Sequence, residues 1–542
     1  MRGFVRPSRL GWRTASIVAL TISSLGCASA RIRRDNAVAL MHADARVLEG
    51  CYDCLRDARA VYERLAGAKK NVVPKNAGPI SVRLFETELL LALREKELGL
   101  DASGSIARAR ALVPRVPAAL EPARVVAMVD AVLPDGRAMA LGAHDALIRS
   151  HRAYLERIDD DLTWVEQSPL TPAVRKYVAL ALDCSYFDRR GQDTTALSKR
   201  RAVPINAPPL VAYRAANCAT SDTLALKRVL TQVPTFAAAA YALGNEVVWA
   251  SGETGGEDAR RYYAQAYERF PRSAGITFMT GWLDLNIGDC VEAARLYDTT
   301  LAIVPDHDRA MLQKTICLST MHEDSAAIAT ATRFIGLSTG DIAQGYYWRA
   351  VSRLRRRELA LARGDADSAK LYTSRGSGEL LTLAGIIEHE QADYGIAESD
   401  LRGARSLPKG IENCNAAFYL GNVVVKREGW PEAVAAYDSA MTCYDDQVNL
   451  LEGKIEQVRR SRRGSAAFRA KRIAALESDL ADRRKRSRTA AFNAAAMNAR
   501  LANFDRAEAL LVIASQSPDL AGQIERLRSQ IAEVSRQRPV PN

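Results

Sequence analysis

The fold is decided by the stretch AGITFMTGWLDLNIGDCVEAARLYDTTLAIVPDH, residues 274–307. Gly281, Gly288, Ala293, Tyr297 and Pro305 occupy positions 8, 15, 20, 24 and 32 of these 34 residues. The proline near the end stops a helix, because proline has no backbone N–H to continue the hydrogen-bond ladder. A pattern of this length is typical of internal repeats.

The same offsets recur at three other places in the chain. The preceding repeat follows them once three extra residues are allowed in the glycine-rich turn at 251–256, a third repeat starts at Cys414, and a fourth covers 503–518. The residues that carry the match are Leu243, Gly244, Ala259, Tyr263, Ala266, Pro271, Leu420, Gly421, Trp430, Ala433, Tyr437, Ala440, Ala507, Leu511, Ala514 and Pro518. This pattern resembles the tetratricopeptide repeat (TPR), a pair of antiparallel helices. The resemblance implies that small residues at positions 8 and 20 let helices approach closely, and that the pairs stack into a right-handed α-solenoid.

The composition agrees with an all-α fold. The chain of 542 residues is 48% hydrophobic and 25% charged, which excludes a mainly disordered, collagen-like or multi-span membrane protein. It has few glycines and prolines and long runs of Ala, Leu and Arg, which favour helices. Residues 308–337, 344–375 and 380–408 keep helical spacing but lose the glycines, so we interpret them as degenerate repeats. Residues 37–66 predict another hairpin, with its turn at Gly50.

The sequence is expected to divide into seven segments. They are a lipoprotein-type signal peptide (1–26), an N-terminal helical region (27–165), an irregular helical region with a Pro-rich loop (166–233), a TPR-like array (234–447), a long basic helix or helical pair (448–490), a C-terminal hairpin with a capping helix (491–534) and a disordered tail (535–542).

The first thirty residues have the pattern of a bacterial export signal. Four arginines precede the apolar stretch 15–26, which is shorter than the ~20 residues of a membrane span. The end of this stretch, Ser24-Leu25-Gly26-Cys27, resembles a lipobox, which implies a lipid on Cys27 and retention at the outer membrane. Ser24 departs from that pattern, which usually has leucine there. Cleavage after Ala30 is the alternative, and it would give a soluble periplasmic or secreted protein. Either way the expected location is the cell envelope or beyond, with the lipid as the only membrane contact.

The cysteines suit an oxidising compartment. Eight follow Cys27, namely Cys51, Cys54, Cys184, Cys218, Cys290, Cys317, Cys414 and Cys443, and an even count there predicts disulfides. The pair at 51 and 54 has the C-x-x-C spacing, so a structural disulfide, a redox-active pair and a free or metal-bound pair all remain open. The repeat resemblance implies pairing of Cys414 with Cys443 and of Cys290 with Cys317, which leaves Cys184 with Cys218.

The repeat resemblance also implies a concave groove lined by the first helix of each pair. Carried onto this sequence, its positions give a candidate partner groove of Tyr241, Asn245, Trp249, Phe278, Trp282, Phe418, Asn422 and Lys426. Aromatic and amide side chains together suit an extended peptide or a partner helix, because the aromatics supply buried area and the amides pair with backbone. The alternative is that these aromatics pack within the stack.

A basic stretch lies between residues 456 and 490. It has twelve basic and four acidic residues, and its densest part is Arg459, Arg460, Arg462, Arg463, Arg483, Arg484, Lys485 and Arg486. Clustered positive charge attracts an anionic surface such as lipid head groups, polysaccharide or an acidic partner. The alternative is a solvated helix face. Nucleic acid is not expected as a partner, because export removes the chain from the cytoplasm and few aromatics interleave with the charges.

No motif nominates catalytic, cofactor-binding or metal-ligating residues. Zinc-helix, phosphate-loop, dinucleotide and serine-nucleophile spacings are absent from the sequence. We therefore expect an exported, lipid-anchored, non-enzymatic TPR-type scaffold for protein–protein interactions at the cell envelope. The alternatives are a glycan- or ligand-capturing lipoprotein of nutrient uptake and an enzyme with accessory repeats.

Overall fold

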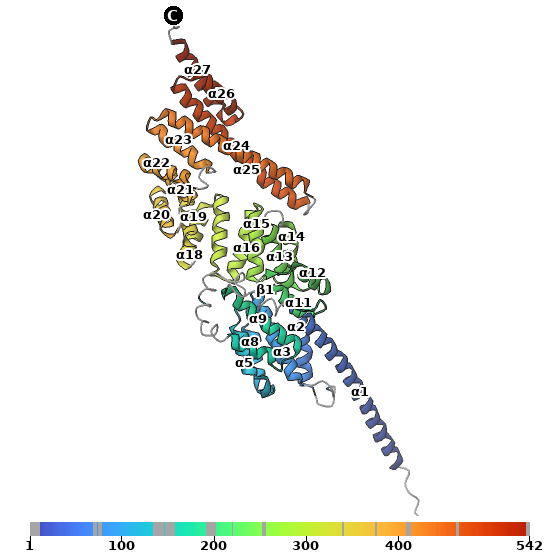
Figure 1. Ribbon diagram of the computed structural model, residues 1–542. Coiled ribbons are helices and arrows are strands. Elements are labelled where there is room, and N and C mark those ends of the chain that lie inside the picture. The colour runs from blue at the N-terminus through green and yellow to red at the C-terminus, as the bar shows by residue number, and fades with distance from the viewer. Residues whose placement is uncertain are drawn as a thin grey trace, which may run out of the picture. The chain divides into compact units, whose positions relative to one another are not determined.

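The computed structural model describes residues 11–68, 73, 79–133, 146, 158–190, 202–218, 220–251, 256–338, 341–373, 377–407, 413–461 and 466–537. The side chains of 11–29, 158–159, 185–190, 220–221, 249–251 and 256–257 are outside the description. The described chain is helical except for one antiparallel pair of two-residue strands, β1 (Asn217–Cys218) and β2 (Thr220–Ser221) (Figure 1). None of its helices is long and apolar enough to span a membrane.

The chain forms two compact units. Unit 1 runs to residue 252 and includes 261–276, and unit 2 includes 256–260 and everything described from residue 277 on. The α-helices in the described residues up to 269 are α1 (Gly11–Glu49), α2 (Tyr52–Ala66), α3 (Ile80–Glu97), α4 (Ser103–Leu112), α5 (Pro122–Ala131), α8 (Ile158–Gln167), α9 (Pro172–Arg190), α11 (Pro209–Ala216), α12 (Thr223–Gln232), α13 (Ala237–Ser251) and α14 (Gly256–Arg269).

The core of unit 1 is organised around α3, which packs against α2, α4, α5 and α9. Its residues from Leu84 to Lys96 are all buried, charged ones included. The Arg94 guanidinium donates to the Gly50 carbonyl at 3.0 Å and lies over the ring of Tyr213. The Lys96 ammonium donates to three carbonyls at the end of α5, of which Val132 is the last. The charges of α3 therefore join neighbouring helices.

The hairpin expected at residues 37–66 is confirmed. Helix α1 ends at Glu49 and α2 begins at Tyr52, with Gly50 between them at φ +71°. A side chain at Gly50 would also collide with Leu210 of α11, since its Cβ would lie 2.6 Å from Leu210 Cδ1. Glycine is required there for both the backbone angle and the space.

Unit 2 is an array of helical hairpins. Its helices are α15 (Ala274–Asn286), α16 (Cys290–Ile303), α17 (Asp308–Thr320), α18 (Asp324–Leu337), α19 (Ile342–Arg355), α20 (Leu359–Tyr372), α21 (Gly378–Glu390), α22 (Tyr394–Ser406), α23 (Cys414–Lys426), α24 (Trp430–Arg460), α25 (Ala466–Arg500), α26 (Phe504–Ala514) and α27 (Ala521–Gln537). From α16 to α27, consecutive helices pack on each other.

The glycines at position 8 lie where the two helices of a hairpin cross, as the repeat pattern predicts. A Cβ on Gly281 would approach Tyr297 Cε1 to 3.1 Å, and a Cβ on Gly421 would approach Tyr437 Cε1 to 2.6 Å. In unit 1, Gly244 has the same relation to Tyr263, at 2.7 Å. The tyrosine ring at position 24 therefore occupies the space that a side chain at position 8 would take. These hairpins have the TPR geometry.

The interpretation that all three degenerate repeats lose their glycines is wrong for one of them. Gly385 lies at position 8 of the repeat that begins at Gly378, and its Cβ would lie 2.6 Å from Leu401 Cγ. In the preceding repeat, Ala350 and Ala362 are fully buried and take positions 8 and 20. A methyl group is small enough for the crossing, so a search for glycine misses that repeat.

Helices α24 and α25 extend far beyond the hairpins to which they belong, at 31 and 35 residues. We call their paired extension, residues 445–461 and 466–487, the arm. At its base, the Ser487 hydroxyl donates to Asp445 at 2.6 Å. Near its tip, Lys471 pairs with Asp289, in the turn between α15 and α16. Gly288 in the same turn has φ +86°, and a Cβ there would lie 2.7 Å from Ala475 Cβ. The arm thus joins the α23 end of the array to the α15–α16 end.

Candidate partner-binding groove

A groove of about 760 Å³ lies in unit 2, between the first helices of three successive hairpins and the arm. Its lining includes Tyr347, Val351 and Leu354 of α19, Glu379, Thr382, Leu383 and Ile386 of α21, Asn415 and Tyr419 of α23, and Gln447 and Arg483 of the arm. The volume is in the range of small-molecule sites and of the pockets that hold peptide side chains. An apolar floor with a few polar groups is the composition expected of a binding site.

Two tyrosines stand in the groove. Burial raises the pKa of Tyr347 to about 12, with a further contribution from Glu379. Burial also raises the pKa of Tyr419, whose ring contacts Phe418 and His389. Both hydroxyls therefore stay protonated at neutral pH and are hydrogen-bond donors.

Amide side chains and a disulfide hold the α23 side of the groove in place. The Asn413 amide donates to Thr382 Oγ1 at 2.6 Å, and its oxygen accepts from the backbone N–H of Ala416 at 3.1 Å. Asn415 accepts from the Tyr444 hydroxyl at 2.6 Å. The disulfide between Cys414 and Cys443 joins the first residue of α23 to α24. These contacts position α21, α23 and the base of the arm relative to one another.

Several predicted groove residues are buried within their own hairpins, so their assignment to the groove is wrong. Tyr241, Asn245 and Phe278 are each at most 5% exposed. The Tyr263 hydroxyl donates to Asn245 at 2.8 Å, and Phe278 packs against the ring of Tyr297. The physical reason is that these side chains of the first helix contact the tyrosine at position 24, inside the hairpin.

The other predicted groove residues do not line this groove. Asn422 is half-buried and accepts a hydrogen bond from the Tyr437 hydroxyl. Phe418 and Trp282 are half-buried, and Lys426 is exposed. The side chain of Trp249 lies outside the described residues. A partner contact at Trp282 or Lys426 stays a prediction.

Sequence reasoning missed the residues that do line the groove, apart from Arg483 and Cys414, which it assigned to the basic patch and to a disulfide. Tyr347 and Val351 take positions 5 and 9 of their repeat, and Thr382 and Ile386 take the same positions of the next. These are the positions from which the groove was predicted, but in repeats whose register was not assigned. The alanines at positions 350 and 362 were the signal that could have set it.

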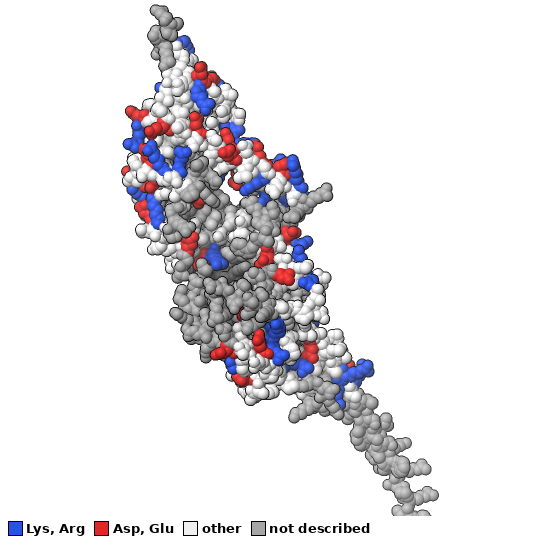
Figure 2. Space-filling view, viewed as in Figure 1, with Lys and Arg blue, Asp and Glu red and all other residues white. Residues whose placement is uncertain are grey.

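The basic patch is largely paired with acidic residues. Arg459 pairs with Glu477, Arg460 with Glu456, Arg484 with Glu452, Lys485 with Asp519 and Arg486 with Asp482. Arg462 and Arg463 lie outside the described residues. On the visible face, basic and acidic side chains alternate over α24 and α25 (Figure 2). The stretch is therefore less cationic at its surface than its sequence indicates.

Three of the four candidate disulfides are formed, namely Cys51–Cys54, Cys184–Cys218 and Cys414–Cys443. The fourth pairing is corrected, because Cys290 and Cys317 are free, buried thiols. They are hydrogen-bonded to each other, and Cys290 also to Thr320, which lowers the pKa of Cys290. Helices α16 and α17 thus place the two thiols in hydrogen-bonding contact, but no disulfide joins them.

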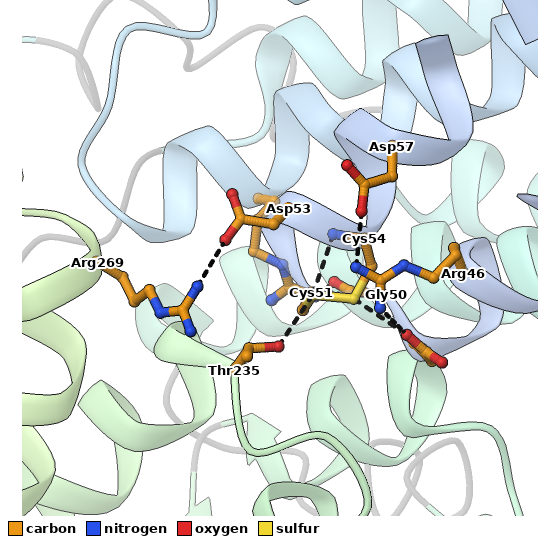
Figure 3. Close-up of a disulfide and its surroundings, with 10 residues drawn as sticks. Arg46, Gly50, Cys51, Asp53, Cys54, Asp57, Thr235 and Arg269 are labelled. Atoms are coloured by element: carbon orange, nitrogen blue, oxygen red, sulfur yellow. Dashed lines mark hydrogen bonds and ion pairs between the residues drawn. A yellow bond between two sulfur atoms is a disulfide. The ribbon is translucent and has the colours of Figure 1, made fainter. Parts of the chain in front are cut away.

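The C-x-x-C pair is a disulfide at the start of α2 (Figure 3). Cys51 is the N-cap, and its sulfur accepts from the Cys54 backbone N–H at 3.1 Å. Both cysteines are completely buried. Ion pairs cross the site from Arg46 to Asp57 and from Arg269 to Asp53. A bonded, solvent-excluded pair supports the structural alternative over a redox-active one, since exchange requires access to a sulfur.

The buried titratable groups of unit 1 serve helix packing. Glu86 accepts from the backbone N–H and hydroxyl of Thr171, and Glu88 pairs with Arg108. The Tyr177 hydroxyl donates to Glu97 at 2.8 Å. Each of these carboxylates joins α3 to another helix, so their shared role is to hold the core together.

The sequence matches no protein family, and no curated protein either. Solved structures are similar at low identity. MamA from Desulfovibrio magneticus RS-1 is 17% identical, with 32% of this chain and 95% of that one covered and a TM-score of 0.30. A tetratricopeptide repeat protein from Parabacteroides merdae ATCC 43184 is 12% identical, with 56% and 99% covered and a TM-score of 0.34. YrrB, described as a TPR protein with an unusual peptide-binding site, is 14% identical, with 35% and 97% covered and a TM-score of 0.28. The repeat architecture of this chain rests on its own hairpin geometry.

Proposed function

We propose that this protein is a scaffold that binds a peptide segment of a protein partner in the groove of unit 2. The observation that carries the proposal is the shared lining by α19, α21, α23 and the arm, which places protonated tyrosines and other polar side chains along an apolar floor. An extended peptide needs both, because its backbone must be hydrogen-bonded when it leaves water and its side chains supply apolar contact.

The groove is built to need little rearrangement on binding. The Cys414–Cys443 disulfide, the Asn413 amide and the arm's contact at Asp289 fix its walls. Preorganised walls lower the conformational entropy lost on binding, which leaves more of the contact energy as affinity. This supports a binding function for the same residues that stabilise the array.

The proposal includes export and a lipid anchor on Cys27 at the cell envelope. Its support is the sequence of residues 1–30 alone. Incorporation of radiolabelled palmitate is expected in the wild-type chain and not in Cys27→Ala. Equal labelling of both chains, or retention of the leader, would contradict the anchor without affecting the groove.

The groove is tested by selecting ten-residue peptides from a random display library on the purified chain. Adjacent tyrosines on α19 give a matched control, because Tyr347 lines the groove while Tyr346 stacks on Tyr372 at 5.8 Å. We expect Tyr347→Ala to weaken selected peptides about tenfold or more and Tyr346→Ala to leave them unchanged. Equal effects of the two variants, or no selected peptides, would contradict the proposed function.

A further inference from the structure

Four consecutive basic residues on α25 differ in how their charges are neutralised. Arg484 pairs with Glu452 and Lys485 pairs with Asp519. Arg486 donates to Asp482 at 2.7 Å. Each of these three therefore has a carboxylate of its own. All three are also well exposed, with side chains 41% exposed or more.

Arg483 is the exception. Its nearest carboxylate is Asp482 at 3.7 Å, which already accepts from Arg486, and Arg483 makes no hydrogen bond within the described parts of the chain. It lines the groove, and its side chain is 33% exposed. A guanidinium has five N–H donors in a planar fork, so Arg483 presents unused donors to the groove from a partly desolvated position.

The arm holds Arg483 at this place. One turn away, Arg486 reaches Asn415 of α23, and Ser487 donates to Asp445 across the arm's base. At the far end, Lys471 pairs with Asp289. Because α25 is held by contacts on both sides of Arg483, the guanidinium lies over the groove without any movement of the arm.

The described lining of the groove has one acidic and one basic side chain, Glu379 and Arg483. Glu379 is on the first turn of α21 and close enough to Tyr347 to help raise its pKa. Arg483 lies near Tyr444, at the α23 side. An acidic group in the groove is therefore favoured beside Arg483 and disfavoured beside Glu379.

We propose that Arg483 selects the partner: the groove takes an extended peptide with an aspartate or glutamate that pairs with Arg483, and with apolar residues that lie on Leu383 and Ile386. This inference rests on the proposed function and adds the chemistry of the partner. The arm, which lies outside the repeat pattern, is then part of the binding site. Arg483 is the specificity-determining residue of that site.

The test compares peptide selections on the full chain with Arg483→Met, Arg483→Glu and the control Arg484→Met. Arg484 lies next in sequence but pairs with Glu452. We expect acidic residues to be enriched by wild type and Arg484→Met, loss of that acidic enrichment with Arg483→Met, and enrichment of basic residues with Arg483→Glu. Circular dichroism confirms that each variant is folded.

A double-mutant cycle then measures the pair. For the tightest wild-type peptide, changing its acidic residue to the amide should weaken binding about tenfold in wild type and leave binding to Arg483→Met unchanged. A wild-type pool without acidic enrichment, or an equal loss in both chains, would overturn the inference while the Tyr347 result still supports the groove. Failure of Tyr347→Ala to weaken any peptide would overturn the proposed function and this inference with it.

Discussion

The hydroxyl of Tyr437 donates a 2.8 Å hydrogen bond to the amide oxygen of Asn422, while its ring lies against the adjacent Gly421. Tyr263 and Asn245 repeat this relation beside Gly244. In each case the tyrosine at position 24 meets a glycine at position 8 and an asparagine at position 9. The residues at these three positions thus determine how closely the two helices approach and whether the tyrosine hydroxyl has a hydrogen-bond partner.

The repeat at 274–307 lacks the asparagine. Position 9 is Trp282, and the Tyr297 hydroxyl is buried with no hydrogen-bond partner among the described residues. Removing an unsatisfied buried hydroxyl costs nothing, whereas removing a satisfied one leaves its partner unpaired. We expect Tyr437→Phe to lower the free energy of unfolding by about 1 kcal/mol and Tyr297→Phe to leave it unchanged or raise it, as measured by urea denaturation. Equal losses would show that the hydrogen bond is not what distinguishes the two sites.

The helix crossings predict a contrast between two glycines. Gly421→Ala places a methyl group against the Tyr437 ring, so we expect a loss of about 1–3 kcal/mol. Gly453→Ala, on the exposed face of α24 with nothing within 4 Å, should gain up to about 1 kcal/mol from helix propensity. Thermal unfolding of the two variants gives the comparison, and a stabilised Gly421→Ala chain would contradict the close crossing.

His307 predicts a pH-dependent loss of stability. It caps α17 with Nδ1 accepting from the Ala310 N–H at 3.2 Å, and burial lowers its pKa to about 4. Since the unfolded chain binds a proton near pH 6.5 and the folded chain only near pH 4, stability falls as the pH drops through this window. The full effect is roughly 3 kcal/mol.

The matched variant is His307→Asn, which keeps an N-cap but does not titrate. Burial raises the pKa of Glu388 to about 7, which acts in the opposite direction and stabilises the fold as the pH falls. Both chains share Glu388, so the difference between their urea midpoints isolates His307. We expect the difference to change between pH 6.5 and 4, and a constant difference would rule out the buried neutral imidazole.

Two of the disulfides should differ in how much they contribute to the stability of the fold. Replacing both cysteines of Cys414–Cys443, which lie 29 residues apart, is expected to lower stability by about 3.5 kcal/mol in the chain-entropy model. Replacing Cys51 and Cys54, which lie three residues apart, is expected to cost about 2 kcal/mol in the same model. Calorimetry of the two double-alanine variants measures the order, and the reverse order would contradict the loop-length argument.

The sequence was sufficient to predict the helical hairpins and the helix crossings at Gly244, Gly281 and Gly421. Gly281 and Gly421 are set by local packing within one repeat, so their spacing to Tyr297 and Tyr437 is visible along the chain. The groove was not predictable in the same way. Ala350 replaces glycine in the repeat that presents Tyr347, and an alanine in an alanine-rich chain is not a distinctive marker.

The arm shows more clearly what could not be predicted from the sequence. Its basic residues were evident in the sequence, but the carboxylate with which each one pairs can lie far away along the chain, such as Glu452 for Arg484 and Asp289 for Lys471. Lys471 and Asp289 are 182 residues apart. Only the tertiary structure distinguishes the arginine that faces the groove from its paired neighbours.

The measurement that tests the central claim most directly is hydrogen exchange of the full chain with and without a selected peptide. Backbone amides should be protected in α19, α21, α23 and the arm, with α15 and α16 unchanged except at the turn that receives Lys471. Protection centred on α13 to α16, or none in α21, would show that the partner binds elsewhere.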